Sequence, residues 1–284
     1  MKISVLLCVF NGQSSLARAI ESILKQDFRE FEFLIINDGS TDKTEEIVNK
    51  YLKLDSRIKY FFKEHSGLTD SLNYGLKKSS GDWIARIDAD DYSQKNRLYK
   101  QLKFVENNKN IVLLGSNFSF IIDNKISHNS KLPLTHKSLI KNLKNSMAFF
   151  PHSSAFFSRK KAIQIGGYRC FFIKAQDHDL WLRLSEVGAI ACKEENLVSI
   201  YDHHDRLTNK SSGYPQYIYA FAAITSYFAR QERFFHLEKI INNNYYVNNF
   251  LDSLSNYIYK NKYNENLNFK RNLKKLISKK YKIL

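Results

Sequence analysis

Apolar runs and amphipathic segments alternate along the first 117 residues of the chain. Runs rich in β-branched residues, typical of strands covered on both faces, lie at 3–10, 31–37, 58–62, 83–87 and 111–114. Between these runs, apolar residues recur at helical spacing, as in the pairs Leu16 and Ile20, Val48 and Leu52, Leu68 and Leu72, and Leu98 and Leu102. This order predicts an α/β fold in which an open, mostly parallel, twisted sheet is flanked by helices.

Polar residues follow several of these strands at the point where each strand ends. Asn11 comes after the first strand, Asp38 after the second, and three carboxylates within 88–91 after the fourth. The carboxyl ends of parallel strands meet at one edge of a sheet, where open α/β sheets bind their ligands. We therefore expect these groups to gather at one site. For Asp38 two roles stay open, that of a turn residue and that of a hydrogen-bond acceptor for a ligand.

Asp88 and Asp90 stand two positions apart at the end of the fourth strand. Side chains alternate along an extended strand, so these two carboxylates are expected to converge on one ligand, with Asp91 facing elsewhere. Carboxylates with no His or Cys beside them suit Mg²⁺ or Mn²⁺, which bind through one or two such groups together with substrate phosphates. The pattern therefore predicts a metal-nucleotide site. The alternative is that these acids solvate a loop or cap a helix beginning near Asn96.

Composition limits the classes of protein that fit. With 284 residues, 43% of them hydrophobic, the chain can bury a sizeable core. No run reaches the roughly 18 apolar residues of a membrane span, and the opening run lacks a cleavage site, so a cytoplasmic protein is expected. Three scattered cysteines argue against a disulfide framework or a zinc site. A formal charge of +16 indicates anionic partners.

The chain divides by pattern into three parts: 1–117, 118–214 and 215–284. The last part holds 12 Lys or Arg against 4 Asp or Glu, with apolar positions at helical spacing, and is predicted to be a basic helical extension. Packing on the catalytic domain, homodimer contact and peripheral contact with the inner face of the cytoplasmic membrane are all open to it. Basic aromatic stretches also occur in nucleic-acid binders, but no recognition motif supports such a partner, and none is expected.

Four segments, at 5–12, 35–42, 67–76 and 85–91, resemble the successive motifs of family 2 glycosyltransferases with the GT-A fold. The resemblance covers roughly residues 1–205 and assigns the first two parts of the chain to the nucleotide-sugar-binding and acceptor-binding halves of one domain. It implies that Phe10, Asn11 and Asp38 cradle the nucleobase and ribose. It also implies that Asp88 and Ala89 contact the nucleotide and that Asp90 holds the diphosphate-bound metal.

A second acidic segment begins at Gln176. Leu180 and Leu184 share one helical face, which puts Asp177 in the first turn, where the helix dipole favours a carboxylate. An ordinary N-cap is the alternative role. The family resemblance implies that Asp177 is the general base. Members usually carry Glu at the position of Gln176, which cannot ionise but can still form hydrogen bonds.

Further side chains are expected to contact the donor, the acceptor or the metal. The resemblance implies that His204 approaches the metal or the diphosphate, although Asp202 stands where relatives carry Arg. Asp91, Gln176, His152 and Trp181 are expected as donor or acceptor contacts. A His beside Pro151 is also an ordinary structural residue.

Together these features predict an inverting, metal-dependent glycosyltransferase that uses Mn²⁺ or Mg²⁺. The expected donor is a UDP-hexose or UDP-N-acetylhexosamine. The resemblance implies, as acceptor, a hydroxyl of a bacterial surface glycan such as lipopolysaccharide, O-antigen or capsule, free or lipid-linked. Two alternatives stay open: a nucleotidyltransferase acting on sugar phosphates, and a basic nucleic-acid-binding module with a degenerate site. The sequence has no Gly-rich triphosphate loop near its start, which disfavours the first.

Overall fold

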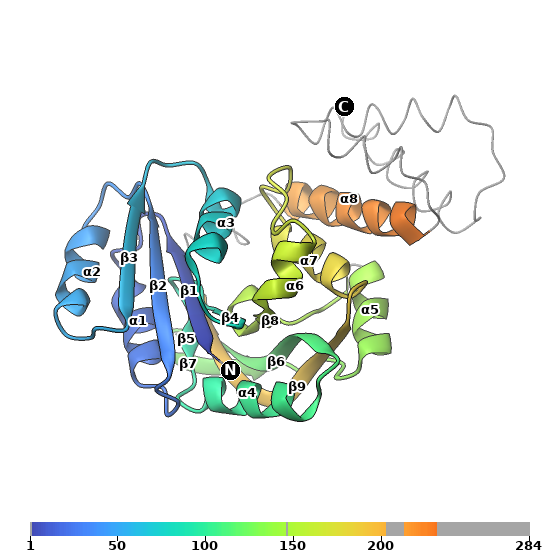
Figure 1. The fold of residues 1–284 in the computed structure, drawn as a ribbon, viewed down its shortest axis with the longest axis horizontal. Helices are drawn as coiled ribbons and strands as arrows, with labels where there is room; N and C mark the ends of the chain where they lie inside the picture. Colours follow the sequence, from blue (N-terminus) through green and yellow to red (C-terminus); the bar gives the residue numbers. More distant parts are fainter. Residues whose placement is uncertain (1, 146, 203–212, 232–284) are drawn as a thin grey trace. The chain divides into compact units, whose positions relative to one another are not determined.

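The structure, a computed structural model, describes residues 2–145, 147–202 and 213–231 (Figure 1). The chain forms a compact unit of residues 1–224 and a second unit that begins at Thr225. Every helix within the described ranges is too short or too polar to cross a lipid bilayer. Of the predicted extension 215–284, residues 215–231 are described and are helical, and its contact with a membrane or a second copy stays a prediction.

Over residues 3–114 strands and helices alternate in the order that the sequence pattern predicts, with the short strand Tyr92–Ser93 as an addition. The strands are β1 (Ile3–Val9), β2 (Phe31–Asp38), β3 (Ile58–Lys63), β4 (Trp83–Arg86), β5 (Tyr92–Ser93), β6 (Ile111–Ile122), β7 (Lys125–Asn129), β8 (Phe156–Ser158) and β9 (Ala189–Tyr201). The helices are α1 (Leu16–Leu24), α2 (Thr44–Leu52), α3 (Leu68–Lys78), α4 (Arg97–Asn107), α5 (His136–Lys144), the 3₁₀ turn η1 (His152–Ser154), α6 (Arg159–Gln164), α7 (Gln176–Leu184) and α8 (Gly213–Gln231).

The described strands form one sheet in the order β3-β2-β1-β4-β8-β6-β9-β5, with β7 paired to β6. Strands β3, β2, β1 and β4 are mutually parallel, as predicted, and β6 runs parallel to β9. The short strand β8 is antiparallel to both β4 and β6, and β5 is antiparallel to β9. The predicted α/β class with an open sheet and flanking helices is confirmed, and the sheet as a whole is mixed because β8 enters it in the opposite direction.

Alternate side chains of β1 face two different helix layers. Ile3, Val5 and Leu7 belong to a buried cluster that includes residues of α1, α2 and α4. On the other face, α3 approaches the sheet closely because Gly75 has no side chain: a Cβ there would lie 2.3 Å from Cδ1 of Leu6. With helices on both faces, the open edge at the carboxyl ends of β1, β2 and β4 is left for polar groups.

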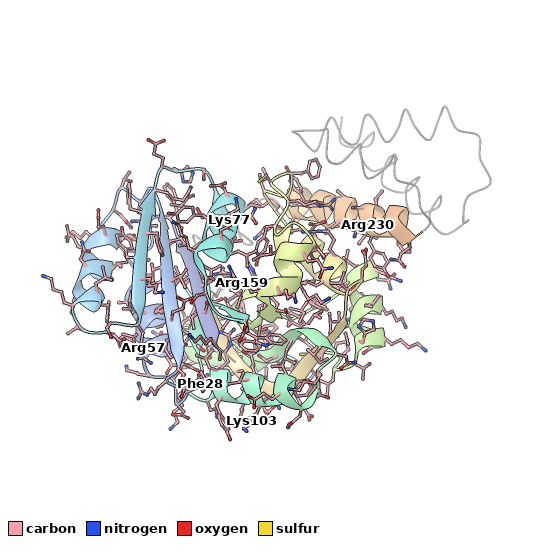
Figure 2. The ribbon with its side chains drawn as sticks, viewed as in Figure 1. Phe28, Arg57, Lys77, Lys103, Arg159 and Arg230 are labelled. Carbon is pink, nitrogen blue, oxygen red and sulfur yellow. The ribbon has the colours of Figure 1, made fainter. Side chains whose placement is uncertain are left out.

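Long basic side chains connect elements that are distant in sequence (Figure 2). Arg159, at the start of α6, donates from Nε to the carbonyl oxygen of Leu76 in α3, at 3.2 Å. The guanidinium of Arg57 lies over the ring of Phe31, 4.3 Å from its centroid. These contacts connect α6 to α3, and the segment before β3 to the first residue of β2.

Candidate active site

The carboxylates after β4 lie on a turn. Strand β4 ends at Arg86, and the backbone N–H of Asp91 donates to the carbonyl oxygen of Asp88, at 3.2 Å. The expectation that Asp88 and Asp90 alternate along an extended segment is therefore wrong. The side chain of Ser153, in η1, stabilises this turn. Its Oγ accepts from Asp88 N at 3.1 Å, and its hydroxyl donates to the carboxylates of Asp88 and Asp91. Asp91 is buried, whereas Asp88 and Asp90 are half-buried.

Arg86 is a buried charge directly beneath this turn. Its guanidinium, 0% exposed, donates to the carbonyl oxygens of Leu6 and Ile87, the latter at 2.9 Å. It also forms an ion pair with Asp88. Burial alone lowers the pKa of Arg86, but the neighbouring groups, Asp88 first among them, together outweigh burial and the net shift is upward. No role was predicted for Arg86 from the sequence, although a charged residue inside an apolar strand indicates a buried ion pair.

Arg18 of α1 holds the same turn from its outer side. Its Nη2 donates to the carbonyl oxygen of Asp90 at 2.6 Å, and its guanidinium lies 3.6 Å from the ring centroid of Tyr201. The end of β9 therefore lies beside the carboxylate turn. His204 lies outside the described residues, and its role as a metal ligand stays a prediction.

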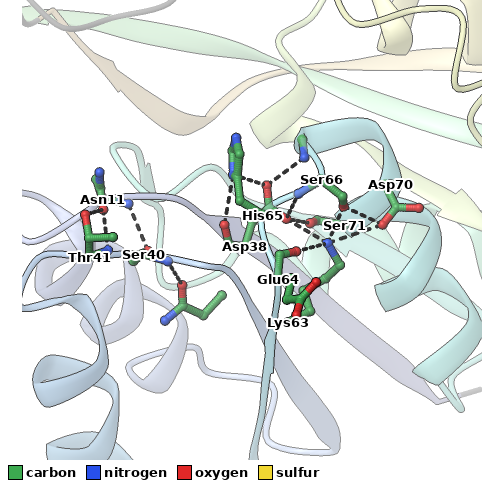
Figure 3. Close-up of polar contacts among 12 residues, drawn as sticks. Asn11, Asp38, Ser40, Thr41, Lys63, Glu64, His65, Ser66, Asp70 and Ser71 are labelled. Atoms are coloured by element: carbon green, nitrogen blue, oxygen red, sulfur yellow. Dashed lines mark hydrogen bonds and ion pairs between the residues drawn. The ribbon is translucent and has the colours of Figure 1, made fainter.

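Asp38, at the end of β2, organises the loop that precedes α3 (Figure 3). Its Oδ1 accepts from Lys63 Nζ at 2.8 Å, from Ser71 Oγ at 2.8 Å and from Ser66 N at 3.1 Å. Gly67 N donates to its Oδ2 at 2.9 Å. Burial alone raises the pKa of Asp38, but these hydrogen bonds bring it below its ordinary value. Of the two roles predicted, the structure shows the loop-forming one; contact with a nucleotide stays a prediction.

The exposed rings of Phe10 and His65 pack against each other, and His65 lies beside Asp38 (Figure 3). Phe10 is 48% exposed, and its ring centroid lies 4.2 Å from that of His65. His65 Nδ1 lies 3.0 Å from the carbonyl oxygen of Asp38, so the imidazole is held in place. An exposed pair of rings next to hydrogen-bonding groups is suited to a flat base. No sequence pattern indicated His65, because its position depends on the loop that Asp38 organises through its hydrogen bonds.

Asn11 forms the rim next to these rings. It adopts a positive φ of 52°, which Asn tolerates better than most residues. Its Oδ1 accepts from Thr41 N at 2.8 Å, and its N–H donates to Ser40 Oγ at 2.9 Å (Figure 3). A surface hollow on the α2 side of this rim, separate from the carboxylates, is lined by Gln13, Lys43, Glu46, Ile47 and Lys50.

Asp177 lies in the first turn of α7, as predicted. The N-cap is Ala175, in the left-handed region with φ 52°, so the alternative of Asp177 as N-cap is wrong. Asp177 Oδ1 accepts from His178 N at 2.8 Å, and both Asp177 and Gln176 are half-buried. The carboxylate is thus at the helix N-terminus, where the dipole stabilises its charge.

The next turn of α7 is fixed by a buried ion-pair cluster. Asp179, 1% exposed, pairs with Arg183 at 2.7 Å and with Arg169. Burial raises the pKa of Asp179, but the charges of Arg183 and Arg169 lower it to about 2. Because three charged groups satisfy one another, α7 and the loop before it are held together.

His152 is a buried ring next to Arg86. Its Nε2 is 3.2 Å from Arg86 Nε and 2.8 Å from the hydroxyl of Tyr168. Burial and the charge of Arg86 lower the pKa of His152 to about 4, while the charges of Asp88 and Asp177 act in the opposite direction. Asp88 and Asp177, distant in sequence, therefore both lie within electrostatic reach of one buried ring.

Two expected contact residues are placed behind the site. His152 is 7% exposed and Trp181 is 1% exposed, and their rings pack edge to face with centroids 5.7 Å apart. Trp181 also packs on Phe150 and Phe157. Both side chains are packed in the core, which periodicity on α7 could not show for Trp181, and their contact with a donor or acceptor stays a prediction.

The donor set fits a metal that arrives with its substrate. Within the described ranges, no three His, Cys, Asp or Glu side chains gather closely enough to enclose an ion. Asp88 and Asp90, on a half-buried turn, can supply one or two carboxylates, which is the number that Mg²⁺ uses when phosphates and waters complete its shell.

A parallel half-sheet with helices on both faces, continued by a mixed half that carries the second acidic segment on α7, is the arrangement of the GT-A glycosyltransferase fold. S. aureus TarS bound to UDP-GlcNAc has this fold, with a TM-score of 0.67 at 18% identity over 81% of this chain and 67% of that chain. So does the Pyrobaculum calidifontis mannosyltransferase PcManGT bound to GDP-Man and Mn²⁺, with a TM-score of 0.58 at 16% identity over 81% of this chain and 64% of that chain.

The family follows from the sequence match. The model of Glycosyl transferase family 2 matches residues 4–166. An uncharacterized glycosyltransferase of Haemophilus influenzae is 30% identical over 234 residues, which cover 73% of this chain and 71% of that protein. The chain belongs to glycosyltransferase family 2, and the predicted family, fold and enzyme class are confirmed.

Proposed function

We propose that this glycosyltransferase is an inverting, metal-dependent enzyme that moves a sugar from a UDP-sugar to a hydroxyl of a bacterial surface glycan. The observation that carries the proposal is that the charges of Asp88 and Asp177, which are distant in sequence, both act on the buried ring of His152. Support for a sugar nucleotide comes from the solved relatives, whose bound donors are UDP-GlcNAc and GDP-Man. The basic charge of the chain favours an anionic, lipid-linked or surface acceptor.

The chain's residues divide the work between donor and acceptor. Phe10 and His65 would stack on the base, and Asn11 would contact the nucleoside from the rim. Asp88 and Ala89 would contact the ribose and Asp90 would hold Mn²⁺ or Mg²⁺. A bound divalent ion neutralises the charge that develops on the departing diphosphate.

Asp177 would act as the general base. It would take the proton from the acceptor hydroxyl as the new C–O bond forms on the face of the anomeric carbon opposite the leaving nucleoside diphosphate. That geometry inverts the anomeric centre. Gln176 and Asp91 would assist by hydrogen bonding and by fixing the turn.

A donor screen with Mn²⁺ and the Asp177→Asn variant tests this proposal. The wild type is expected to release UDP from at least one UDP-sugar. In Asp177→Asn, kcat is expected to fall by about 100-fold or more, because a base contributes roughly 10²- to 10⁴-fold, while UDP binding persists. The matched control is Asp123→Asn, which changes an exposed acid in the β6–β7 turn and is expected to keep full activity.

Two results would contradict the proposal. Full sugar transfer by Asp177→Asn would remove the base assignment. Release of pyrophosphate from a nucleoside triphosphate, without turnover of any sugar nucleotide, would favour a nucleotidyltransferase.

A further inference from the structure

A continuous chain of buried hydrogen bonds crosses the domain beneath the site. It starts at Asn73 in α3, whose amide accepts from Tyr168 N at 2.9 Å and donates to Tyr168 O at 2.7 Å. The Tyr168 hydroxyl then reaches His152 Nε2, which is also bonded by Arg86 Nε. Arg86 ends the chain at the carboxylate of Asp88.

The chemistry of the groups sets the direction of these bonds. A guanidinium can only donate, so His152 Nε2 accepts from Arg86 and carries no proton. The Tyr168 hydroxyl, 2.8 Å from the same nitrogen, is then a second donor to it. The neutral imidazole in this tautomer thus accepts hydrogen bonds from Arg86, which pairs with Asp88 on the nucleotide side, and from Tyr168, which is linked to α7.

The same chain is anchored to α7. Arg183 of α7 donates from Nη2 to the carbonyl oxygen of Gly167 at 2.7 Å, directly before Tyr168. A Cβ at Gly167, which has a φ of +66°, would lie 2.6 Å from Oδ1 of Asn73, so the segment is pressed against α3. Moving Tyr168 would therefore disturb α7, whose first turn carries Asp177.

Burial excludes direct contact of these groups with a substrate. Tyr168 is 1% exposed, Arg86 is 0% exposed and His152 is 7% exposed. Their reach is through Asp88 on one side and through α7 on the other.

We propose that Tyr168 and His152 are positioning residues that fix the separation between Asp88, on the nucleotide side, and Asp177, the base. This inference rests on the proposed function. It adds a feature that the proposed function does not require: one buried nitrogen atom, His152 Nε2, accepts hydrogen bonds from both halves of the site.

Tyr168→Phe is the sharpest test, because it removes one oxygen atom and leaves the ring and both backbone bonds to Asn73. We expect kcat to fall by about 10- to 100-fold, the usual effect of losing an outer-shell partner. The KM for the sugar nucleotide is expected to change by less than about threefold, since the groups that bind the nucleotide remain.

Tyr51→Phe is the matched control. The Tyr51 hydroxyl, on a buried ring of α2, donates to Glu21 at 2.8 Å and takes no part in the chain. Both variants lose one hydroxyl hydrogen bond, so both are expected to lower Tm by a few degrees, about 2–4 °C. Only Tyr168→Phe is expected to lower kcat.

A second pair of variants tests whether the chain acts as a unit. His152→Gln keeps an acceptor near the position of Nε2 and is expected to retain more activity than His152→Leu. Adding Tyr168→Phe to His152→Leu is expected to cost less than about twofold more, because the bond is already lost.

The inference is overturned by an active wild type whose Tyr168→Phe variant keeps its kcat, or by losses in Tyr168→Phe and His152→Leu that simply multiply in the double variant. A wild type that turns over no sugar nucleotide would instead refute the proposed function. In that case the position of the His152 ring is followed by the fluorescence of Trp181, which packs on it. The fluorescence of Trp181 is expected to change in Tyr168→Phe and not in Tyr51→Phe.

Discussion

Arg86 shows how a single residue shapes the carboxylate turn. Removing a guanidinium from water is costly unless hydrogen bonds and an opposite charge compensate. Here two carbonyl oxygens, one imidazole nitrogen and one carboxylate surround it. Asp88 is held by that charge before any ligand arrives, which is the condition for a preorganised nucleotide site.

The pH dependence of stability is predicted at the same scale, from His152. Its folded pKa of about 4 lies below the ordinary value of 6.5, so between these pH values the unfolded chain binds a proton that the folded protein does not. The stability that the neutral His152 contributes to the folded protein is therefore fully present above pH 6.5 and is lost as the pH falls toward 4. The free energy of unfolding should fall by roughly 3 kcal/mol over this window.

Urea unfolding of wild type and His152→Gln between pH 7 and pH 4 measures this effect. The lowered pKa values of His136 and His178 act in the same direction in both proteins, so the difference between the two curves isolates His152. Parallel curves would contradict the assignment of a buried neutral imidazole.

At the scale of elements, the sequence predicted the helices and the long strands but not the direction of every strand. Continuous apolar runs such as 3–10 are unambiguous because both faces of the strand are covered. Strand β8, with only Phe156–Ser158, is too short to show a period, and it is the strand that makes the sheet mixed. Residues 111–114, predicted as a short strand, are the start of a longer strand, β6. Its apolar pattern is interrupted by Ser116 and Asn117, which are polar but buried.

Gly115 in β6 gives a prediction for this element. A Cβ there would lie 2.0 Å from Cγ of Phe150, a ring that is 2% exposed and packs on Trp181. Gly115→Ala is expected to destabilise the protein by about 1–3 kcal/mol through overpacking. Thermal or urea unfolding measures the loss.

A second-site change separates overpacking from other causes. Phe150→Ala removes the obstructing Cγ and Cδ atoms, so the double variant Gly115→Ala with Phe150→Ala should be more stable than the sum of the two single effects predicts. Strict additivity would show that Phe150 is not the obstacle.

At the scale of the molecule, sequence reasoning located the site better than it described it. Strand ends near Asn11, Asp38 and Asp88 meet at one edge, as the parallel order of β1, β2 and β4 requires. The turn at 88–91, the ring pair of Phe10 with His65 and the inward faces of His152 and Trp181 could not be predicted. Each depends on side chains from other elements, such as Ser153 and Arg18, whose arrival at the edge is a property of the folded chain.

The central claim is that acids distant in sequence gather around one metal-bound nucleotide. The most direct test is a crystal structure of the protein with UDP and Mn²⁺, in which anomalous scattering locates the metal. The account predicts a manganese peak at the carboxylate of Asp90, the diphosphate over the 88–91 turn, the base beside Phe10 and His65, and Asp177 facing the diphosphate from α7. A manganese peak away from the turn, or Asp177 on the far side of the domain from the nucleotide, would contradict it.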